Sequence, residues 1–426
     1  RKIKIALAGH GNRGLDTYAM MVKQMPEKAE IVAVADTDPG KVAKAAEEFQ
    51  IPAERQFASA EEMLAQDKLA DAMFITTQDR QHVGHAIPAL KKGYDLLLEK
   101  PISPDLAECR EILKIAEECG RKVVVCHVLR YTPFFRKLKE IIDSGVIGDI
   151  VSVIGAENVG YWHQAHSFVR GNWRNSDETS PMILQKCCHD MDFLLWLTGK
   201  TCESVSSYGS TYLFKKENQP EGAADYCLGG CKVKEECPFD AEKIYMDDPK
   251  RGIRSGNTDW PVNVLDIHPT EESIYEAIKS GPYGRCVYAC DNNVVDHQVV
   301  NMKMTDGATI SFTMCGFTNL CTRYEKFMGT GGEILAEMDK KLIAVEPFGK
   351  EKVVYDLSSD EADMKGHGGG DKRIVETFID LLLNGKAITN AITSLEQSVE
   401  SHYCALAAEE SRKNGGQAVL LDKYRG

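Results

Sequence analysis

The segment Ile3-Lys4-Ile5-Ala6-Leu7-Ala8-Gly9-His10-Gly11-Asn12-Arg13-Gly14 decides how this chain begins to fold. It joins a short apolar run directly to a G-x-G-x-x-G turn, and a helical pattern follows the turn. Gly9 permits the tight turn, Gly11 lets the backbone approach a pyrophosphate, and Gly14 lets the helix pack closely on the strand. The N-terminus of a helix also favours negative charge. The segment therefore predicts the first strand, turn and helix of a Rossmann domain that binds a dinucleotide.

A carboxylate stands at the end of the second predicted strand. Asp36 follows an apolar run and lies 22 residues beyond Gly14. An acid about 20 residues beyond the turn accepts hydrogen bonds from the adenosine ribose in such domains. A carboxylate would repel a 2′-phosphate, and no arginine follows in Thr37-Asp38-Pro39. The sequence therefore predicts NAD rather than NADP as the cofactor.

Short apolar runs alternate with helical patterns through the first 130 residues. Nearly continuous apolar runs are typical of strands that are buried on both faces of a parallel sheet. Ser59 with Glu62 forms a capping box, which marks the start of a helix. We therefore predict an α/β fold, with a doubly wound parallel sheet in an NAD-binding domain over residues 1–130.

The pattern changes from residue 131 onward. Longer strand-like runs recur with little helix between the later ones, as is typical of a mostly antiparallel sheet. Two helical patterns, at about 371–383 and 394–413, close the chain. Residues 215–285 are polar and rich in Gly, Pro and Cys. We therefore predict an α+β substrate and oligomerisation domain over residues 131–426, with a Cys-rich insertion at about 215–285.

Charge and hydropathy exclude several classes of partner. The 51 basic and 64 acidic side chains give a formal net charge of −13, which repels phosphate backbones and anionic lipid. No apolar stretch approaches the roughly 18 residues that a membrane-spanning helix needs. The sequence opens without a visible secretory leader, although position 1 is not Met. We expect a cytoplasmic protein that binds neither nucleic acid nor membranes.

Several short motifs follow the glycine turn in a characteristic order. They are His82, Glu99-Lys100-Pro101, Arg130-Tyr131-x-Pro133, Ser144-Gly145-x-Ile147-Gly148, His189-x-x-Asp192 with Trp196-Leu197, and Gly329-Thr330-x-Gly332-Glu333. With these motifs the chain resembles, over nearly its whole length, the Gfo/Idh/MocA family of glucose–fructose oxidoreductase and inositol dehydrogenase. The resemblance implies NAD-dependent hydride transfer between C4 of the nicotinamide and a carbinol or carbonyl carbon of a sugar, sugar acid or cyclitol.

The resemblance also implies catalytic roles. Lys100 would lie beside the nicotinamide and hydrogen-bond the reacting oxygen, whose proton must be taken up when an alcohol is oxidised. Family members usually carry Asp four residues before a histidine, but here Gln185 stands four residues before His189, and Lys186 follows it. Because glutamine cannot exchange a proton, we expect His189 to be the acid/base. Lys186 would replace the missing charge or bind an anionic substituent.

The expected binding residues form two groups. The cofactor group is Gly9, Gly11, Asn12, Arg13, Gly14, Asp36, Thr76, His82, Glu99, Lys100 and Arg130. Residues 161–174 contain two histidines, two tryptophans and two arginines, which suit the apolar faces and hydroxyls of a sugar. The substrate group is Tyr161, His163, His166, Arg170, Trp173, Arg174 and Gln185. A metal site at His163 and His166, or a purely structural loop, is the alternative for this segment.

The cysteines of the insertion are clustered. Cys227-x3-Cys231-x5-Cys237 is followed by Cys286-x3-Cys290. Three thiolates this close in a region with little core indicate a structural zinc or iron–sulfur site, with Cys290 or Cys286 as the fourth ligand. We take Cys227, Cys231, Cys237 and Cys290 as the candidate zinc ligands. Free thiols, or disulfides in an exported protein, are the alternative.

Two further functions fit the same motifs. One is an NAD-retaining glycoside hydrolase that acts by transient oxidation and elimination, as in relatives such as the NAD-dependent α-N-acetylgalactosaminidases. The other is an NAD-binding sensor without catalysis. In relatives the open sheet of the second domain commonly packs against another subunit, so the resemblance also implies a homo-oligomer, either a dimer or a tetramer.

Overall fold

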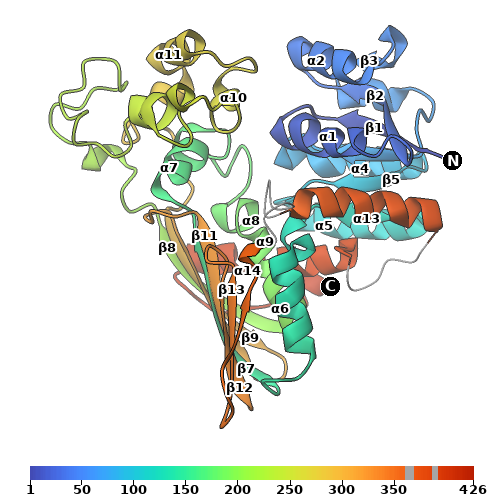
Figure 1. Ribbon diagram of the computed structural model, residues 1–426, viewed down its shortest axis with the longest axis vertical. Coiled ribbons are helices and arrows are strands. Elements are labelled where there is room, and N and C mark those ends of the chain that lie inside the picture. The colour runs from blue at the N-terminus through green and yellow to red at the C-terminus, as the bar shows by residue number, and fades with distance from the viewer. Residues whose placement is uncertain (360–368, 386–391) are drawn as a thin grey trace.

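The first domain of the computed structural model is built on six parallel strands in the order β3-β2-β1-β4-β5-β6 (Figure 1). The structure describes residues 1–359, 369–385 and 392–426. The strands are β1 (Ile3–Ala8), β2 (Ala29–Ala35), β3 (Gln56–Phe57), β4 (Ala72–Ile75), β5 (Asp95–Leu98) and β6 (Val123–Val125). The strand order reverses between β1 and β4, where α/β sheets bind ligands at the carboxyl ends of their strands. The predicted doubly wound sheet is confirmed.

Helices cover both faces of this sheet. They are η1 (Asn12–Ala19), α1 (Met20–Lys23), α2 (Pro39–Phe49), η2 (Ala53–Arg55), α3 (Ala60–Ala65), η3 (Asp79–Gln81), α4 (His82–Lys91) and α5 (Leu106–Cys119). The Oγ of Ser59 accepts a hydrogen bond from the N–H of Glu62 at 3.1 Å, as the capping motif predicts.

One helix from the far end of the chain also packs on the first domain. The helix α13 (Gly370–Asn384) contacts α1, η1 and β1. Phe378 lies on Phe74 of β4, with ring centroids 5.9 Å apart. The sequence assigned this segment to the second domain, because a local pattern does not show which sheet an amphipathic helix covers.

The second domain is built on nine strands in the order β14-β13-β12-β11-β7-β10-β9-β8-β15. Among the described residues of this sheet, only β7 and β10 pair in parallel, so the predicted mostly antiparallel sheet is confirmed. The strands are β7 (Ile150–Asn158), β8 (Cys202–Ser210), β9 (His297–Met304), β10 (Thr309–Cys315), β11 (Thr322–Gly329), β12 (Gly332–Glu337), β13 (Leu342–Pro347), β14 (Val353–Asp356) and β15 (Val419–Leu420).

Helices cover one face of the second sheet. Along β9 and β10, buried and exposed residues alternate, which shows that the other face is open. The helices of this domain are η4 (Val128–Tyr131), α6 (Pro133–Asp143), α7 (Tyr161–His163), η5 (Gln164–Arg170), α8 (Met182–Gln185), α9 (Cys188–Thr198), α14 (Leu395–Lys413) and α15 (Asp422–Arg425). No helix in the described part of the chain is long and apolar enough to cross a membrane.

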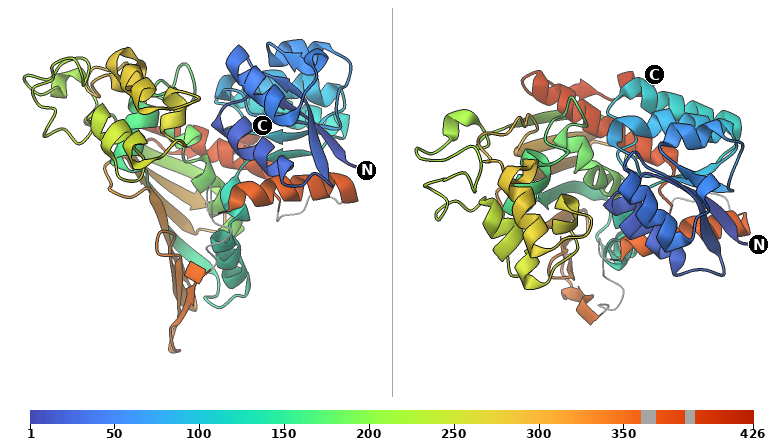
Figure 2. Two further views of the ribbon diagram at one scale, coloured as in Figure 1. Left: turned by 45° about the horizontal axis from the view of Figure 1, so that its top comes forward. Right: turned by 90° about the horizontal axis from the view of Figure 1, so that it is seen from above.

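The predicted insertion forms a small unit with its own apolar core. Its helices are η6 (Lys216–Asn218), η7 (Lys243–Asp247), η8 (Ile253–Ser255), α10 (Val262–Leu265), α11 (Glu271–Ser280) and η9 (Pro282–Gly284). Buried side chains of these segments, such as Tyr245, Val262 and Ile274, pack against Trp162 and Val169 of α7 and η5. Figure 2 shows this unit at one end of the second sheet, next to the first domain.

Candidate active site

The three glycines of the first turn have different roles. Gly9 has φ +92°, and a Cβ there would lie 2.5 Å from the main-chain oxygen of Thr76. A Cβ on Gly14 would lie 2.0 Å from the main-chain oxygen of Gly9. A Cβ on Gly11 would meet no atom within 4 Å. The fold itself therefore requires Gly9 and Gly14, whereas Gly11 borders open space of the kind a pyrophosphate needs for close approach.

Asp36 is already oriented at the end of β2. Its carboxylate accepts hydrogen bonds from the N–H of His10 at 2.6 Å and from the N–H of Asp38 at 2.9 Å. Asp38 in turn caps α2, because its Oδ1 accepts from the N–H of Gly40 at 2.8 Å. The glycine turn and the predicted ribose-binding acid are thus fixed to each other, and the half-buried carboxylate keeps an accessible side.

Arg13 and Glu99 interact with each other. The Nε of Arg13 donates to Glu99 at 3.0 Å, the hydroxyl of Tyr18 donates to the same oxygen at 2.8 Å, and Asp371 of α13 pairs with the Arg13 guanidinium. Burial acts to raise the pKa of Glu99, but the charges of Arg13 and Lys100 outweigh it and lower that pKa. The sequence analysis assigned Arg13 and Glu99 to the cofactor. In the structure they bind each other, and Arg13 also joins the glycine turn to α13.

Three more residues of the predicted cofactor group bind main-chain oxygens or connect two helices: Thr76, His82 and Arg130. Thr76 donates to the main-chain oxygen of Gly9 at 2.7 Å. The ring nitrogens of His82 lie 2.6 Å from the oxygen of Pro101 and 3.0 Å from that of Thr77. Arg130 forms a buried two-bond ion pair with Asp192 of α9, with both bonds at 2.6 Å. The structure therefore gives these residues supporting positions around the cofactor loops.

Lys100 joins the two domains at the expected centre of the site. It follows β5 and is half-buried, and its Nζ donates to the main-chain oxygen of Gln185 at 2.9 Å. His189, on the adjacent helix α9, is 6% exposed. Its ring lies edge-on to that of His127, with centroids 5.7 Å apart. Lys100, Gln185 and His189 therefore gather at one interface, although Gln185 contributes its main chain to the contact.

Two histidines that the sequence analysis did not select lie behind His189. The Nε2 of His402 accepts from the N–H of Ile102 at 2.8 Å, so its Nδ1 carries the proton and donates to Ser398 at 2.6 Å. Burial, with a smaller contribution from His127, lowers the pKa of His402 to about 3. Burial, Arg130 and Lys100 lower the pKa of His127 well below its usual value. His127 follows the carboxyl end of β6, a position that could have drawn attention to it, whereas nothing local distinguishes His402.

Lys186 belongs to a buried ionic network. Its Nζ lies 3.2 Å from Glu157, whose other oxygen lies 2.7 Å from Arg323. Arg323 also pairs with Asp190 at 2.8 Å. Burial, opposed by Arg323, raises the pKa of Asp190 to about 6, and burial together with Asp190 raises that of Glu325. The charge of Lys186 is thus balanced within the protein.

The aromatic segment divides into two parts. His163 stacks on Trp162 and lies beside Cys321, with Nδ1 and Sγ 3.6 Å apart. His166 is buried in the insertion core, where it stacks on a tyrosine ring and hydrogen-bonds the hydroxyl of Tyr245 at 2.8 Å. Burial lowers the pKa of His166 to about 3. Trp260 of the insertion, which the sequence analysis did not select, lies 5.0 Å from the His163 ring.

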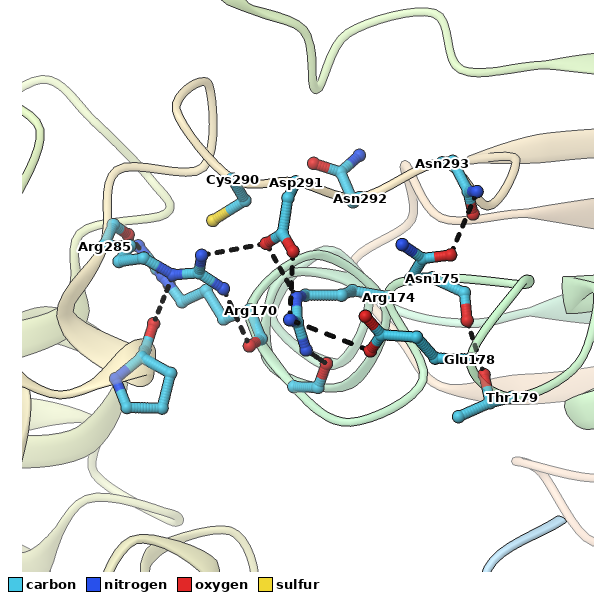
Figure 3. A network of polar contacts seen from close by, with 12 residues as sticks. Arg170, Arg174, Asn175, Glu178, Thr179, Arg285, Cys290, Asp291, Asn292 and Asn293 are labelled. Carbon is cyan, nitrogen blue, oxygen red and sulfur yellow. Dashed lines mark hydrogen bonds and ion pairs between the residues drawn. The ribbon is translucent and has the colours of Figure 1, made fainter. Parts of the chain in front are cut away.

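The two arginines of this segment point toward the insertion (Figure 3). Arg170 is buried and donates to the main-chain oxygens of Arg285 and Phe239, each at 2.7 Å. Arg174 binds Asp291 through two hydrogen bonds of 2.8 and 3.0 Å. Both guanidinium groups are therefore bound by groups of the protein, whereas the sequence analysis assigned them to the substrate. The partners come from residues 239–291, so local reasoning could not find them.

Two aromatic residues of the predicted substrate group lie at the edges of the segment. The Nε1 of Trp173 lies 3.4 Å from Asp79, which also accepts from Ser180 at 2.8 Å, and this contact joins the two domains. Tyr161 packs against Phe239 of the insertion, with ring centroids 6.1 Å apart. Trp173 is therefore a member of the predicted substrate group that contacts the first domain.

Four cysteines line one cavity in the insertion. Cys227, Cys231, Cys237 and Cys286 border a space of about 240 Å³, whereas Cys290 lines a neighbouring one. All fourteen cysteines are free thiols. Within the described ranges, no three His, Cys, Asp or Glu side chains are placed to hold a metal ion. The predicted zinc site at Cys227, Cys231, Cys237 and Cys290 is therefore not supported, and neither is a metal at His163 and His166.

Comparison with known families gives two matches. A model described as an oxidoreductase family with an NAD-binding Rossmann fold matches residues 3–127. A second, described as the C-terminal alpha/beta domain of an oxidoreductase family, matches residues 139–420. Together these matches cover most of the chain and agree with the two domains of the structure.

Individual relatives agree with these matches. The putative oxidoreductase YteT of Bacillus subtilis is 25% identical over 386 residues, which cover 84% of this chain and 85% of YteT. The inositol 2-dehydrogenase of Leifsonia xyli is 28% identical over 209 residues, 48% of this chain and 56% of that protein. The structure of a levoglucosan dehydrogenase in complex with NADH and levoglucosan superposes with a TM-score of 0.71 at 16% identity, covering 99% of this chain and all of that one. At that identity the last comparison shows a shared fold.

Proposed function

The chain belongs to the Gfo/Idh/MocA family of NAD-binding oxidoreductases, and on this premise we propose that it transfers hydride between NAD and a carbinol or carbonyl carbon of a sugar, sugar acid or cyclitol. The inositol dehydrogenase and levoglucosan dehydrogenase relatives support this substrate class. The single observation that carries the proposal is the contact between Lys100 and Gln185, because it brings the end of a Rossmann strand to the second domain.

The described residues fit a dinucleotide. Open space at Gly11 would admit the pyrophosphate, and the oriented carboxylate of Asp36 would bind the ribose hydroxyls. When bound, NAD supplies the carbon that accepts or gives up the hydride. Asn12 begins the helix that follows the turn, so its main chain is available to a phosphate.

Lys100 and His189 would handle the proton. An ammonium group has three donors, and the oxygen of Gln185 takes one from Lys100, so two remain for the reacting oxygen of the substrate. His189 has a small accessible part and a ring supported by His127, which suits an acid/base held in one orientation. Lys186 would position polar groups through its pair with Glu157 rather than exchange a proton.

The substrate would lie between Lys100 and the aromatic side chains of the second domain. His163 and Trp260 present ring surfaces of the kind that pack on the apolar faces of sugars. The amide of Gln185 can donate and accept hydrogen bonds with hydroxyl groups. Hydroxyl-rich rings without a large charge fit this lining, because the nearby ion pairs are satisfied within the protein.

A substrate screen tests the proposal. Purified protein with NAD is offered sugars, sugar acids, cyclitols and nitrophenyl glycosides, while NADH absorbance and nitrophenol release are followed in parallel. NADH formation with a free sugar or cyclitol is the expected result. Release of nitrophenol without net NADH would indicate the NAD-retaining glycoside hydrolase instead, and neither signal in the presence of bound NAD would indicate a sensor.

We also infer a homo-oligomer that associates through the open face of the second sheet. Exposed apolar side chains recur across this face, from Tyr208 of β8 (57% exposed) through Ile154 of β7 (45%) to Val354 of β14 (51%). Exposed apolar patches of this kind mark association surfaces. Light scattering coupled to size-exclusion chromatography tests the inference, with a dimer or tetramer expected. The fourteen free thiols support a cytoplasmic location for the assembly.

A further inference from the structure

The insertion reaches the adenosine end of the predicted cofactor site. A methyl group on Gly40 would lie 3.7 Å from Cδ1 of Ile267 and 3.2 Å from the carboxylate of Asp38. Gly40 stands in the first turn of α2, and the loop before it holds Asp36. Ile267 is therefore a neighbour of the loop that would receive the adenosine ribose. Figure 1 shows α10, which ends just before Ile267, facing α2.

The same segment begins on the substrate side of the site. The ring of Trp260 lies 5.0 Å from that of His163, 5.1 Å from that of Trp162 and 5.2 Å from that of His166. Ile267 follows Trp260 by only seven positions, and α10 lies between them. One short segment thus connects the aromatic part of the substrate site with the ribose part of the cofactor site.

This segment is anchored in the insertion. Val262 of α10 is fully buried in the insertion core. The side chain of Asn257 donates to the main-chain oxygen of Arg251 at 2.7 Å, just before the segment, and Asp266 accepts from the N–H of His268 at 2.9 Å at its end. Residues 260–268 therefore hold a defined position, and they would move together with the insertion.

The chemistry of the segment suits an uncharged adenosine ribose. Residues 260–268 contain Asp266 and no lysine or arginine. With Asp36 and Asp38 on the facing loop, an additional phosphate would meet carboxylates and an apolar side chain, and no cation of the segment would compensate it. The apolar Ile267 can instead pack on the sugar or the base.

We propose that residues 260–268 form a strap across the dinucleotide, with Ile267 packed on its adenosine half and Trp260 held against α7 and η5. The inference rests on the proposed function, since it requires that NAD bind at Gly11 and Asp36. The strap slows the release of the cofactor, and release requires movement of the insertion. It therefore links the cofactor's residence time to the part of the protein that borders the substrate.

Dissociation of NADH tests the strap. Wild-type protein, Ile267→Ala and a control, Val264→Ala, are loaded with NADH and mixed with excess NAD in a stopped-flow instrument that follows nicotinamide fluorescence. Val264 is 37% exposed on the same helix α10. We expect Ile267→Ala to release NADH about three- to tenfold faster, as loss of one apolar contact would produce, and Val264→Ala to match the wild type.

The outcomes separate the strap from the proposed function. Thermal unfolding of Ile267→Ala without cofactor should match the wild type, because Ile267 is only half-buried. If wild-type protein binds NADH and Ile267→Ala releases it at the wild-type rate, the strap is refuted while the proposed function stands. If the wild-type protein binds no NADH, both are refuted.

Discussion

The Nζ of Lys100 donates a hydrogen bond to the main-chain oxygen of Gln185 at 2.9 Å. Lys100 follows the last residue of β5 by two positions, and Gln185 ends α8 of the second domain. Because the acceptor is a backbone atom, the ammonium is oriented by the fold and does not depend on which side chain stands at position 185. This distinction leads to the first two predictions.

Lys100→Met should abolish most of the hydride transfer while NAD still binds. The variant keeps the length of the side chain but removes the amino group that hydrogen-bonds the reacting oxygen and helps to take up its proton, so we expect kcat to fall about 10²- to 10⁴-fold. Initial rates of NADH formation and a calorimetric NAD titration are the measurements. Activity within tenfold of wild type would remove Lys100 from the reaction.

Gln185→Ala should retain most of the activity. The main-chain oxygen that binds Lys100 remains, and only the amide contact to a substrate hydroxyl is lost, so we expect kcat/KM to fall less than about tenfold. The same assay with the same substrate measures the effect. A loss as large as that of Lys100→Met would show that the amide of Gln185 takes part in the reaction.

Arg323→Met should strongly destabilise the protein. Arg323 pairs with Glu157 and Asp190, both fully buried, so the variant leaves Asp190 without this partner and Glu157 with Lys186 alone, at a cost of about 3–5 kcal/mol. Arg254→Met is the control, since Arg254 also pairs with carboxylates, chiefly those of Asp247 and Glu271, but is 41% exposed. Its loss should lower the free energy of unfolding in urea much less than the loss of Arg323, because water screens exposed ion pairs. Equal decreases in the free energy of unfolding for the two variants would contradict the importance of the buried network.

Stability should fall on acidification, partly through His402. Its pKa is 6.5 in an unfolded chain and about 3 in the folded protein. Between these two pH values the unfolded chain binds a proton that the folded protein does not bind. The contribution of His402 to the free energy of unfolding is therefore complete above pH 6.5 and is lost as the pH falls toward 3. The loss is up to about 1.4 kcal/mol per pH unit.

His402→Gln tests this pH dependence. The variant should be less stable at pH 7, because it cannot donate to Ser398 in the same way, but it should lose less stability between pH 7 and pH 5. Urea unfolding at both pH values gives the two differences. Parallel losses in wild type and variant would show that His402 does not contribute to the acid sensitivity.

The features that the sequence predicts correctly depend on local patterns and on the order of motifs along the chain. The turn around Gly9, the position of Asp36 and the motif at Lys100 depend on residues close to each other in the chain. The partners of Arg13 and Arg170 could not be foreseen, because Asp371 lies 358 residues beyond Arg13 and Phe239 lies 69 beyond Arg170. Arginines in a conspicuous motif were therefore assigned to ligands although the fold uses them internally.

Sequence distance also explains why the zinc site was predicted and why Trp260 was not selected. The spacing of Cys227 and its neighbours brought several thiols to one cavity, but spacing alone does not set the directions of their side chains. Trp260 lies about 100 residues from His163 in sequence, and only the folded insertion brings their rings together.

Binding of NAD to Gly11→Ala tests the central claim most directly. Gly11 has φ −71°, which alanine adopts freely, and an added Cβ meets no protein atom within 4 Å. The variant should therefore unfold at the wild-type temperature without cofactor. In a calorimetric titration its affinity for NAD should be at least about tenfold weaker than that of wild type, because the methyl group occupies the approach of the pyrophosphate. Binding of NAD with wild-type affinity would contradict the claim that this turn holds the dinucleotide.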